Sequence, residues 1–90
     1  MTFDEFQNRV GECYDELPKE FQDKFSVYVV EDSKEVKNAF AFYTSMFPNA
    51  ITLIYKVFLD HKDFSKDHIH RVLKHEFEHV LIGKIGRAHV

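Results

Sequence analysis

The histidines of this chain gather in its last third, where two of them have the spacing of metal ligands. All six lie within residues 61–89, and residues 75–79 read H-E-F-E-H, the pattern H-E-x-x-H. Residues i and i+4 of a helix lie on one face, so His75 and His79 can share one zinc ion. Glu76 lies about 100° around the helix from His75, beside such an ion rather than on it. We therefore predict His75 and His79 as zinc ligands and Glu76 as the general base that activates a water molecule.

Three other histidines are weaker candidates for the same site. His68 shares the helix face of His75, but seven residues at 1.5 Å rise per residue place it about 10 Å away along the helix. His70 projects from another side of the helix, and His61 precedes the helix. We expect these three side chains to be solvated or to form local hydrogen bonds.

Four further residues carry reactive side chains but fit ordinary structural roles. Cys13 lies on an apolar stripe and is expected to be a small core residue. A single cysteine cannot form an internal disulfide or a Cys-type zinc site, and it fits a reducing compartment. Glu78 is expected to be solvated on the outer face of the helix. Tyr43 and Tyr55 could donate a hydrogen bond to an oxyanion, but packing in the sheet is the expected role.

Composition excludes several classes of function. The chain has 90 residues, a formal net charge of −3 and 44% hydrophobic residues, which fits one small globular domain. The acidic balance argues against nucleic acid as a partner, and against a small DNA-binding helical domain. The chain contains no run of 18 apolar residues, and its first five residues are acidic rather than basic and apolar. We therefore expect no membrane span, no signal peptide and a cytoplasmic location, while the oligomeric state stays open.

Hydrophobic spacing predicts an α+β domain with N-terminal helices, about three strands and a C-terminal helix that carries the H-E-x-x-H motif. Thr2 and Glu5 have the spacing of a capping box, which begins a helix. Pro18 ends that helix and suits the first turn of the next one, and Ser65 suits the N-cap of the last helix. The predicted helices are 3–16, 19–24 and 66–82, the predicted strands are 25–30, 40–44 and 51–59, and 45–49 and 60–64 are predicted connections.

The chain resembles the minimal zincin family of small bacterial zincin-like metallopeptidase domains over residues 2–83. Besides H-E-x-x-H, the resemblance rests on Thr2-Phe3-Asp4-Glu5-Phe6 and on the segments 15–21, 27–32 and 48–53. It implies a small zincin core with His75 and His79 as ligands and Glu76 as the base. The chain departs from the family at Glu78 and Ile82, where many members have glycine. Family members also continue beyond this region, where the third ligand is expected.

The last residues match a DNA sequence from outside the gene. Residues 85–90 back-translate as ATC GGA AGA GCA CAC GTC, the start of a widely used sequencing-library adaptor, and the two preceding adaptor bases complete a codon for Lys84. We predict a truncated zincin-like domain over 1–83 and an adaptor-derived tail over 84–90. The alternative is a genuine C-terminus, in which His89 turns back as a third ligand.

Together these observations predict a zinc-dependent metallopeptidase that acts on a peptide or protein substrate, with Zn²⁺ as cofactor. Catalytic zinc sites normally have three protein ligands, and this chain securely supplies two, so we expect residues 1–90 to be weakly active or inactive. The alternative is a non-enzymatic zincin-like module that binds a protein partner.

Overall fold

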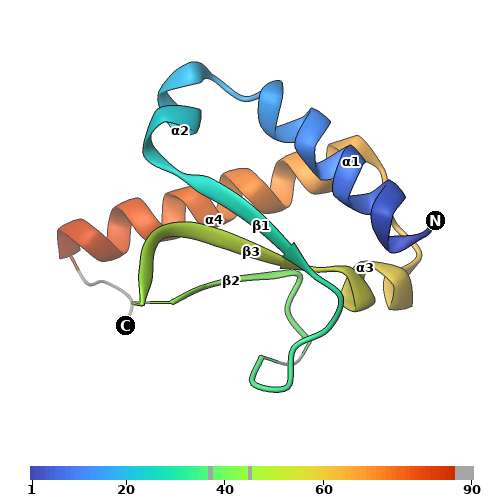
Figure 1. Ribbon diagram of the computed structural model, residues 1–90. Coiled ribbons are helices and arrows are strands. Elements are labelled where there is room, and N and C mark those ends of the chain that lie inside the picture. Colours follow the sequence, from blue (N-terminus) through green and yellow to red (C-terminus); the bar gives the residue numbers. More distant parts are fainter. Residues whose placement is uncertain (37, 45, 87–90) are drawn as a thin grey trace.

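The structure, a computed structural model that describes residues 1–36, 38–44 and 46–86, contains four helices and a three-stranded sheet (Figure 1). This confirms the predicted α+β class. In chain order the elements are α1 (Phe3–Asp15), α2 (Lys19–Lys24), β1 (Ser26–Val30), β2 (Ala41–Thr44), β3 (Phe47–Ile54), α3 (Tyr55–His61) and α4 (Lys66–Gly86).

The first helix begins as predicted, with a capping box. The Thr2 hydroxyl accepts a hydrogen bond from the Glu5 backbone N–H at 3.1 Å, and the Glu5 carboxylate accepts one from the Thr2 N–H at 2.8 Å. These two bonds satisfy backbone donors that the first turn of a helix leaves without partners. Helix α2 also has the predicted bounds, because Pro18 fixes the backbone angle that precedes it.

The sheet has the strand order β1-β3-β2, so β1 and β2 are its edges. Strands β1 and β3 are parallel, with Ser26 opposite Ala50 and Val30 opposite Ile54. Strand β2 is antiparallel to β3, with an irregularity after Phe42. The sheet therefore presents an antiparallel edge strand, β2, on the side opposite to β1.

The segment from residue 47 to 61 differs from the prediction. Residues 45–49 were expected to connect two strands, but β3 already begins at Phe47. The predicted strand 51–59 ends at Ile54 and gives way to helix α3, which continues to His61. A continuous apolar run does not distinguish a strand from a helix. Here Tyr55 and Phe58 lie three residues apart, on the face of α3 that packs against Phe6.

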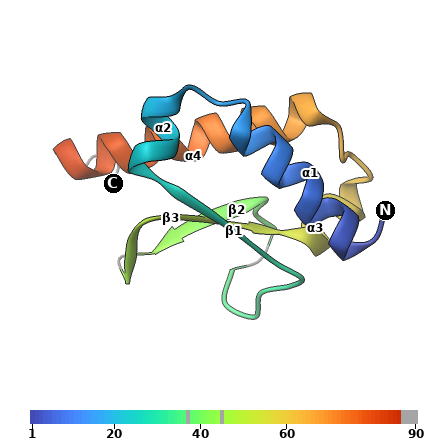
Figure 2. The same ribbon diagram turned by 45° about the horizontal axis from the view of Figure 1, so that its top comes forward.

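The helices α1 and α4 cover one face of the sheet, and the core lies between them and the strands (Figure 2). Helix α4 supplies four side chains to this core that are at most 1% exposed. The other buried members come from α1, the α1–α2 connection, the residue between α2 and β1, strands β2 and β3, and α3: Phe6, Val10, Cys13, Leu17, Phe25, Ala41, Ile51, Leu53 and Phe58. Helix α4 thus both contributes to the core and carries the H-E-x-x-H motif.

Candidate metal centre

The buried side of α4 fixes where the H-E-x-x-H motif points. Ile69, Leu73, Phe77 and Val80 form the buried stripe of the helix. Phe77 is the central residue of the motif, and its ring packs against the rings of Phe21 and Phe25. Because Phe77 points into the core, the histidines two residues before and two residues after it point away from the core.

His75 and His79 come together on the exposed side of α4, as the spacing predicts. Their ring centroids lie 4.4 Å apart, and the rings are inclined by 63°. Two imidazoles that bind one zinc ion at about 2.0–2.1 Å have their centroids about 5 Å apart. A small rotation of either ring therefore brings both nitrogens to a common ion, and the pair fits zinc as part of a ligand set.

Glu76 occupies a different environment from the two histidines. Its side chain is half-buried, and burial raises the pKa of its carboxyl, while the nearby His79 and His75 act in the opposite direction. A raised pKa brings a carboxylate closer to the range in which it exchanges protons near neutral pH.

A groove of about 500 Å³ lies beside the motif, between α4 and the start of β2. His75 and Glu76 line it from the helix, and Phe40 and Ala41 line it from the β2 side. The small side chain of Ala41 leaves room at the point where the edge strand approaches the helix. The groove therefore connects His75, one of the two proposed ligands, and Glu76 to an edge of the sheet.

The described residues supply no third ligand next to His75 and His79. In residues 1–36, 38–44 and 46–86, one group of three side chains has metal-binding atoms that all lie within 4.8 Å of one another, and it is Cys13, Glu16 and His70. Helix α4 extends to Gly86 and so includes part of the segment predicted as a tail. The candidate third ligand His89 lies outside the described residues.

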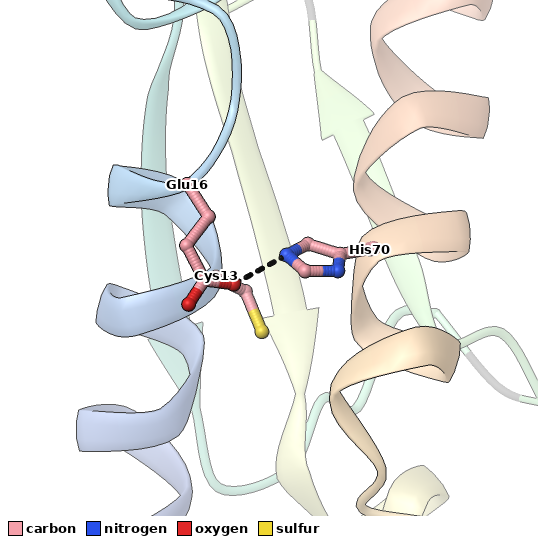
Figure 3. A group of neighbouring side chains, drawn as sticks. All are labelled: Cys13, Glu16 and His70. Atoms are coloured by element: carbon pink, nitrogen blue, oxygen red, sulfur yellow. Dashed lines mark ion pairs between the residues drawn. The ribbon is translucent and has the colours of Figure 1, made fainter.

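The cluster of Cys13, Glu16 and His70 joins α1 to α4 (Figure 3). Nε2 of His70 lies 3.0 Å from Oε1 of Glu16, and Lys66 donates a hydrogen bond to Oε2 of the same carboxylate at 2.9 Å. The thiol of Cys13 donates weakly to the Lys66 carbonyl at 3.9 Å. Nε2 of His70 is buried and has no partner with hydrogen-bond geometry among the described residues, although Glu16 is close enough for an ion pair.

Charges and burial set the protonation of this cluster. The hydrogen bond from Lys66 is the main cause that lowers the pKa of Glu16, so this group is a carboxylate at neutral pH. Burial is the main cause that raises the pKa of Cys13, which has no exposed surface. Cys13 is therefore a buried core residue, as predicted, and its raised pKa disfavours the thiolate that a nucleophile for a substrate in solution would need.

Two of the three remaining histidine predictions are confirmed, and one is wrong. His61 pairs with the Val57 carbonyl at 2.9 Å, and His68 with the Asp63 carbonyl at 3.0 Å, so both have local partners. His70 was also expected to be solvated or locally bonded, but it forms an ion pair with Glu16, the C-terminal cap residue of α1. A helical wheel shows only the direction of His70, whereas the packing of α1 decides what lies there.

Of the two tyrosines expected to pack in the sheet, Tyr43 lies on β2, but the prediction is wrong for Tyr55, because the chain has already turned into α3 at that residue. The hydroxyl of Tyr55 donates to the Met1 carbonyl, and its ring packs against Phe6. Tyr43 is 39% exposed on β2, two residues after Ala41 of the groove. Glu78 is exposed, as predicted.

Comparisons of the chain with protein-family models, with curated proteins and with solved structures find no match. The zincin resemblance therefore rests on the residues of the chain alone. Among the described residues, no helix combines the length and apolar character needed to cross a membrane.

Proposed function

We propose that this chain is a zincin-like domain of a zinc-dependent metallopeptidase. The observation that carries the proposal is the pairing of His75 and His79 on the open side of α4, with half-buried Glu76 beside a groove at the sheet edge. His75 and His79 would hold the zinc ion. When bound, zinc would act as a Lewis acid on a peptide carbonyl and lower the pKa of a water molecule.

The protein side chains have separate roles in this proposal. Glu76 accepts a proton from the attacking water and then delivers it to the leaving amine. The position of Glu76 beside His75 in the lining of the groove supports this role. Phe77 holds the helix so that Glu76 faces the groove.

Strand β2 supplies a place for an extended peptide. It is an edge of the sheet and borders the groove that contains His75 and Glu76. A peptide that pairs with the outer edge of β2 would gain main-chain hydrogen bonds and place one of its peptide bonds over the groove. This arrangement favours an unfolded or extended substrate over a small molecule.

The first test is zinc content. After dialysis against zinc, His75→Ala and His79→Ala should each lose one ion per chain relative to the unaltered protein. Glu76→Gln should keep that ion, because Glu76 is a base rather than a ligand. Equal loss of zinc in Glu76→Gln and in the histidine variants would contradict the assignment, and zinc content unchanged by all three substitutions would remove the metal site altogether.

The second test is cleavage of a mixture of extended peptides by the zinc-loaded chain, followed by mass spectrometry. New termini that are absent with Glu76→Gln would establish peptidase activity. One observation favours the alternative, a zincin-like module that binds a protein partner: the described residues provide two ligands rather than three. Bound zinc at His75 and His79 without cleavage that depends on Glu76 would support that alternative.

A further inference from the structure

We propose that Cys13, Glu16 and His70 form a second metal site, which binds a zinc-like transition-metal ion between α1 and α4. Their metal-binding atoms all lie within 4.8 Å of one another. A tetrahedral ion with bonds of about 2.0–2.3 Å needs its ligand atoms about 3.3–3.8 Å apart. Contraction by about 1 Å, within reach of side-chain rotation, brings the three groups to one ion.

The geometry of His70 fits a metal ligand better than a partner in a well-directed hydrogen bond. Its Nε2 atom is buried and close to Glu16, but their mutual direction does not meet hydrogen-bond geometry. Buried polar atoms normally have a well-directed partner. An ion placed between Nε2 and Oε1 of Glu16 would supply one to both atoms.

The donor set selects the kind of ion. A thiolate and an imidazole favour zinc and similar transition metals, whereas magnesium and calcium prefer oxygen ligands throughout. The thiolate of Cys13 and the carboxylate of Glu16 together balance the charge of a divalent ion. Binding releases the thiol proton to solvent, and a water molecule can complete the tetrahedron.

The surroundings orient the ligands and leave a path for the ion. Lys66 holds Oε2 of Glu16, which leaves Oε1 directed at His70, so the lysine fixes the ligand in the manner of an outer-shell partner. Glu16 and His70 also line a surface hollow of about 330 Å³, which gives access from solvent. The hollow is lined by Arg71 and Lys74 as well as Asp67, so its charges do not favour a cation overall. The affinity for the metal ion must therefore come from the three ligands.

This site is separate from the one formed by His75 and His79. His75 lies five positions after His70, which corresponds to about 140° around the helix. The second site includes a sulfur ligand and the proposed peptidase site does not, so a spectroscopic signal from sulfur distinguishes the two. The proposal therefore stands or falls independently of the proposed function.

The test is titration of the full chain with Co²⁺, followed by near-ultraviolet absorption. A thiolate ligand gives a sulfur-to-cobalt charge-transfer band that imidazole and carboxylate ligands do not give. We expect this band in the unaltered chain and its loss in Cys13→Ser. Substitutions Glu16→Gln and His70→Ala should weaken cobalt binding, measured by this band, at least about tenfold.

Matched variants separate the site from its neighbours. Glu12→Gln also removes a carboxylate near Lys66, which lies 3.5 Å from Glu12, but it should leave the band unchanged. His75→Ala should also leave the band unchanged. Absence of the band in the unaltered chain at saturating Co²⁺ would overturn the proposal. So would a band of equal affinity in Glu16→Gln and His70→Ala, which would show binding by the thiol alone. The Glu16 side chain is 47% exposed, so Glu16→Gln keeps the test valid even where a core substitution impairs folding.

Discussion

Replacement of Phe77 tests how α4 is oriented about its own axis. This orientation decides whether His75 and His79 face away from the core. Phe77 is fully buried, its ring stacks on Phe21 with centroids 5.1 Å apart, and it contacts the ring of Phe25 at 4.7 Å. Phe77 lies about 200° around the helix from His75. If Phe77 belongs in the core, His75 must face away from it.

The expected cost follows from this packing. Truncation of a buried phenylalanine to alanine costs about 3–5 kcal/mol, and the two aromatic contacts place Phe77 near the upper end. A domain of 90 residues has a total stability of about 5–14 kcal/mol. Phe77→Ala would therefore remove a large part of it, and the milder Phe77→Leu should cost about 1–2 kcal/mol.

The free energy of unfolding can be measured by urea denaturation with circular dichroism as the signal. Phe77→Leu should lower the midpoint temperature by roughly 10 °C in a parallel thermal experiment. Tyr28→Leu is the matched control, because Tyr28 is 57% exposed on β1, and it should change the free energy of unfolding by less than about 0.5 kcal/mol. An equally small change in the free energy of unfolding for Phe77→Leu would refute this orientation of α4. It would also refute the outward direction of His75 and His79.

Three further substitutions test the N-terminal half of the fold by the same denaturation experiment. Thr2→Ala should cost about 1 kcal/mol because it removes the N-cap of α1, and no loss would contradict the cap. Hydrogen bonding to the Thr2 backbone is the main cause that lowers the pKa of Glu5. A carboxyl with a lowered pKa in the folded state stabilises the fold above its ordinary pKa, and this contribution is lost as the pH falls through the lowered value. Glu5→Gln should therefore be less stable than the unaltered chain at neutral pH but equal to it in acid, and a difference that persists in acid would argue against this coupling. Tyr14→Phe should cost about 1 kcal/mol, since the Tyr14 hydroxyl donates to the Gln22 carbonyl at 2.8 Å and ties α1 to α2; an unchanged stability would show that this bond contributes nothing.

Features fixed by neighbouring residues were predictable from the sequence. The capping box of Thr2 and Glu5, the helix break at Pro18 and the i, i+4 pair His75 and His79 each involve residues within one or two turns. The boundary between β3 and α3 was not predictable in this way. Residues 51–59 are apolar at both strand and helix spacing, and the packing of α3 on α1 decides between the two structures.

The cluster of Cys13, Glu16 and His70 was also not predictable from the sequence, because it depends on packing between distant segments. Cys13 on α1 and Glu16 at its C-terminal cap lie three positions apart, but His70 is far from them in the sequence and joins them through the packing of α1 on α4. The sequence places Cys13 on an apolar stripe, which favours a core role and conceals its proximity to a histidine. Knowledge of which helices pack together was needed to find the cluster.

The arrangement of α4 also limits where a third ligand for His75 and His79 can come from. Taking the stripe of Ile69, Leu73, Phe77 and Val80 as centre, Glu76 lies about 60° to one side and His70 about 60° to the other. The first side faces β2 and the groove, and the second faces α1. Residues on α1 therefore meet α4 on a different side from Glu76 and the groove. A third ligand that shares the groove with His75 and Glu76 would approach α4 from the β2 side, whereas a metal ion held by Cys13, Glu16 and His70 would link α4 to α1 without supplying a ligand to the proposed peptidase site.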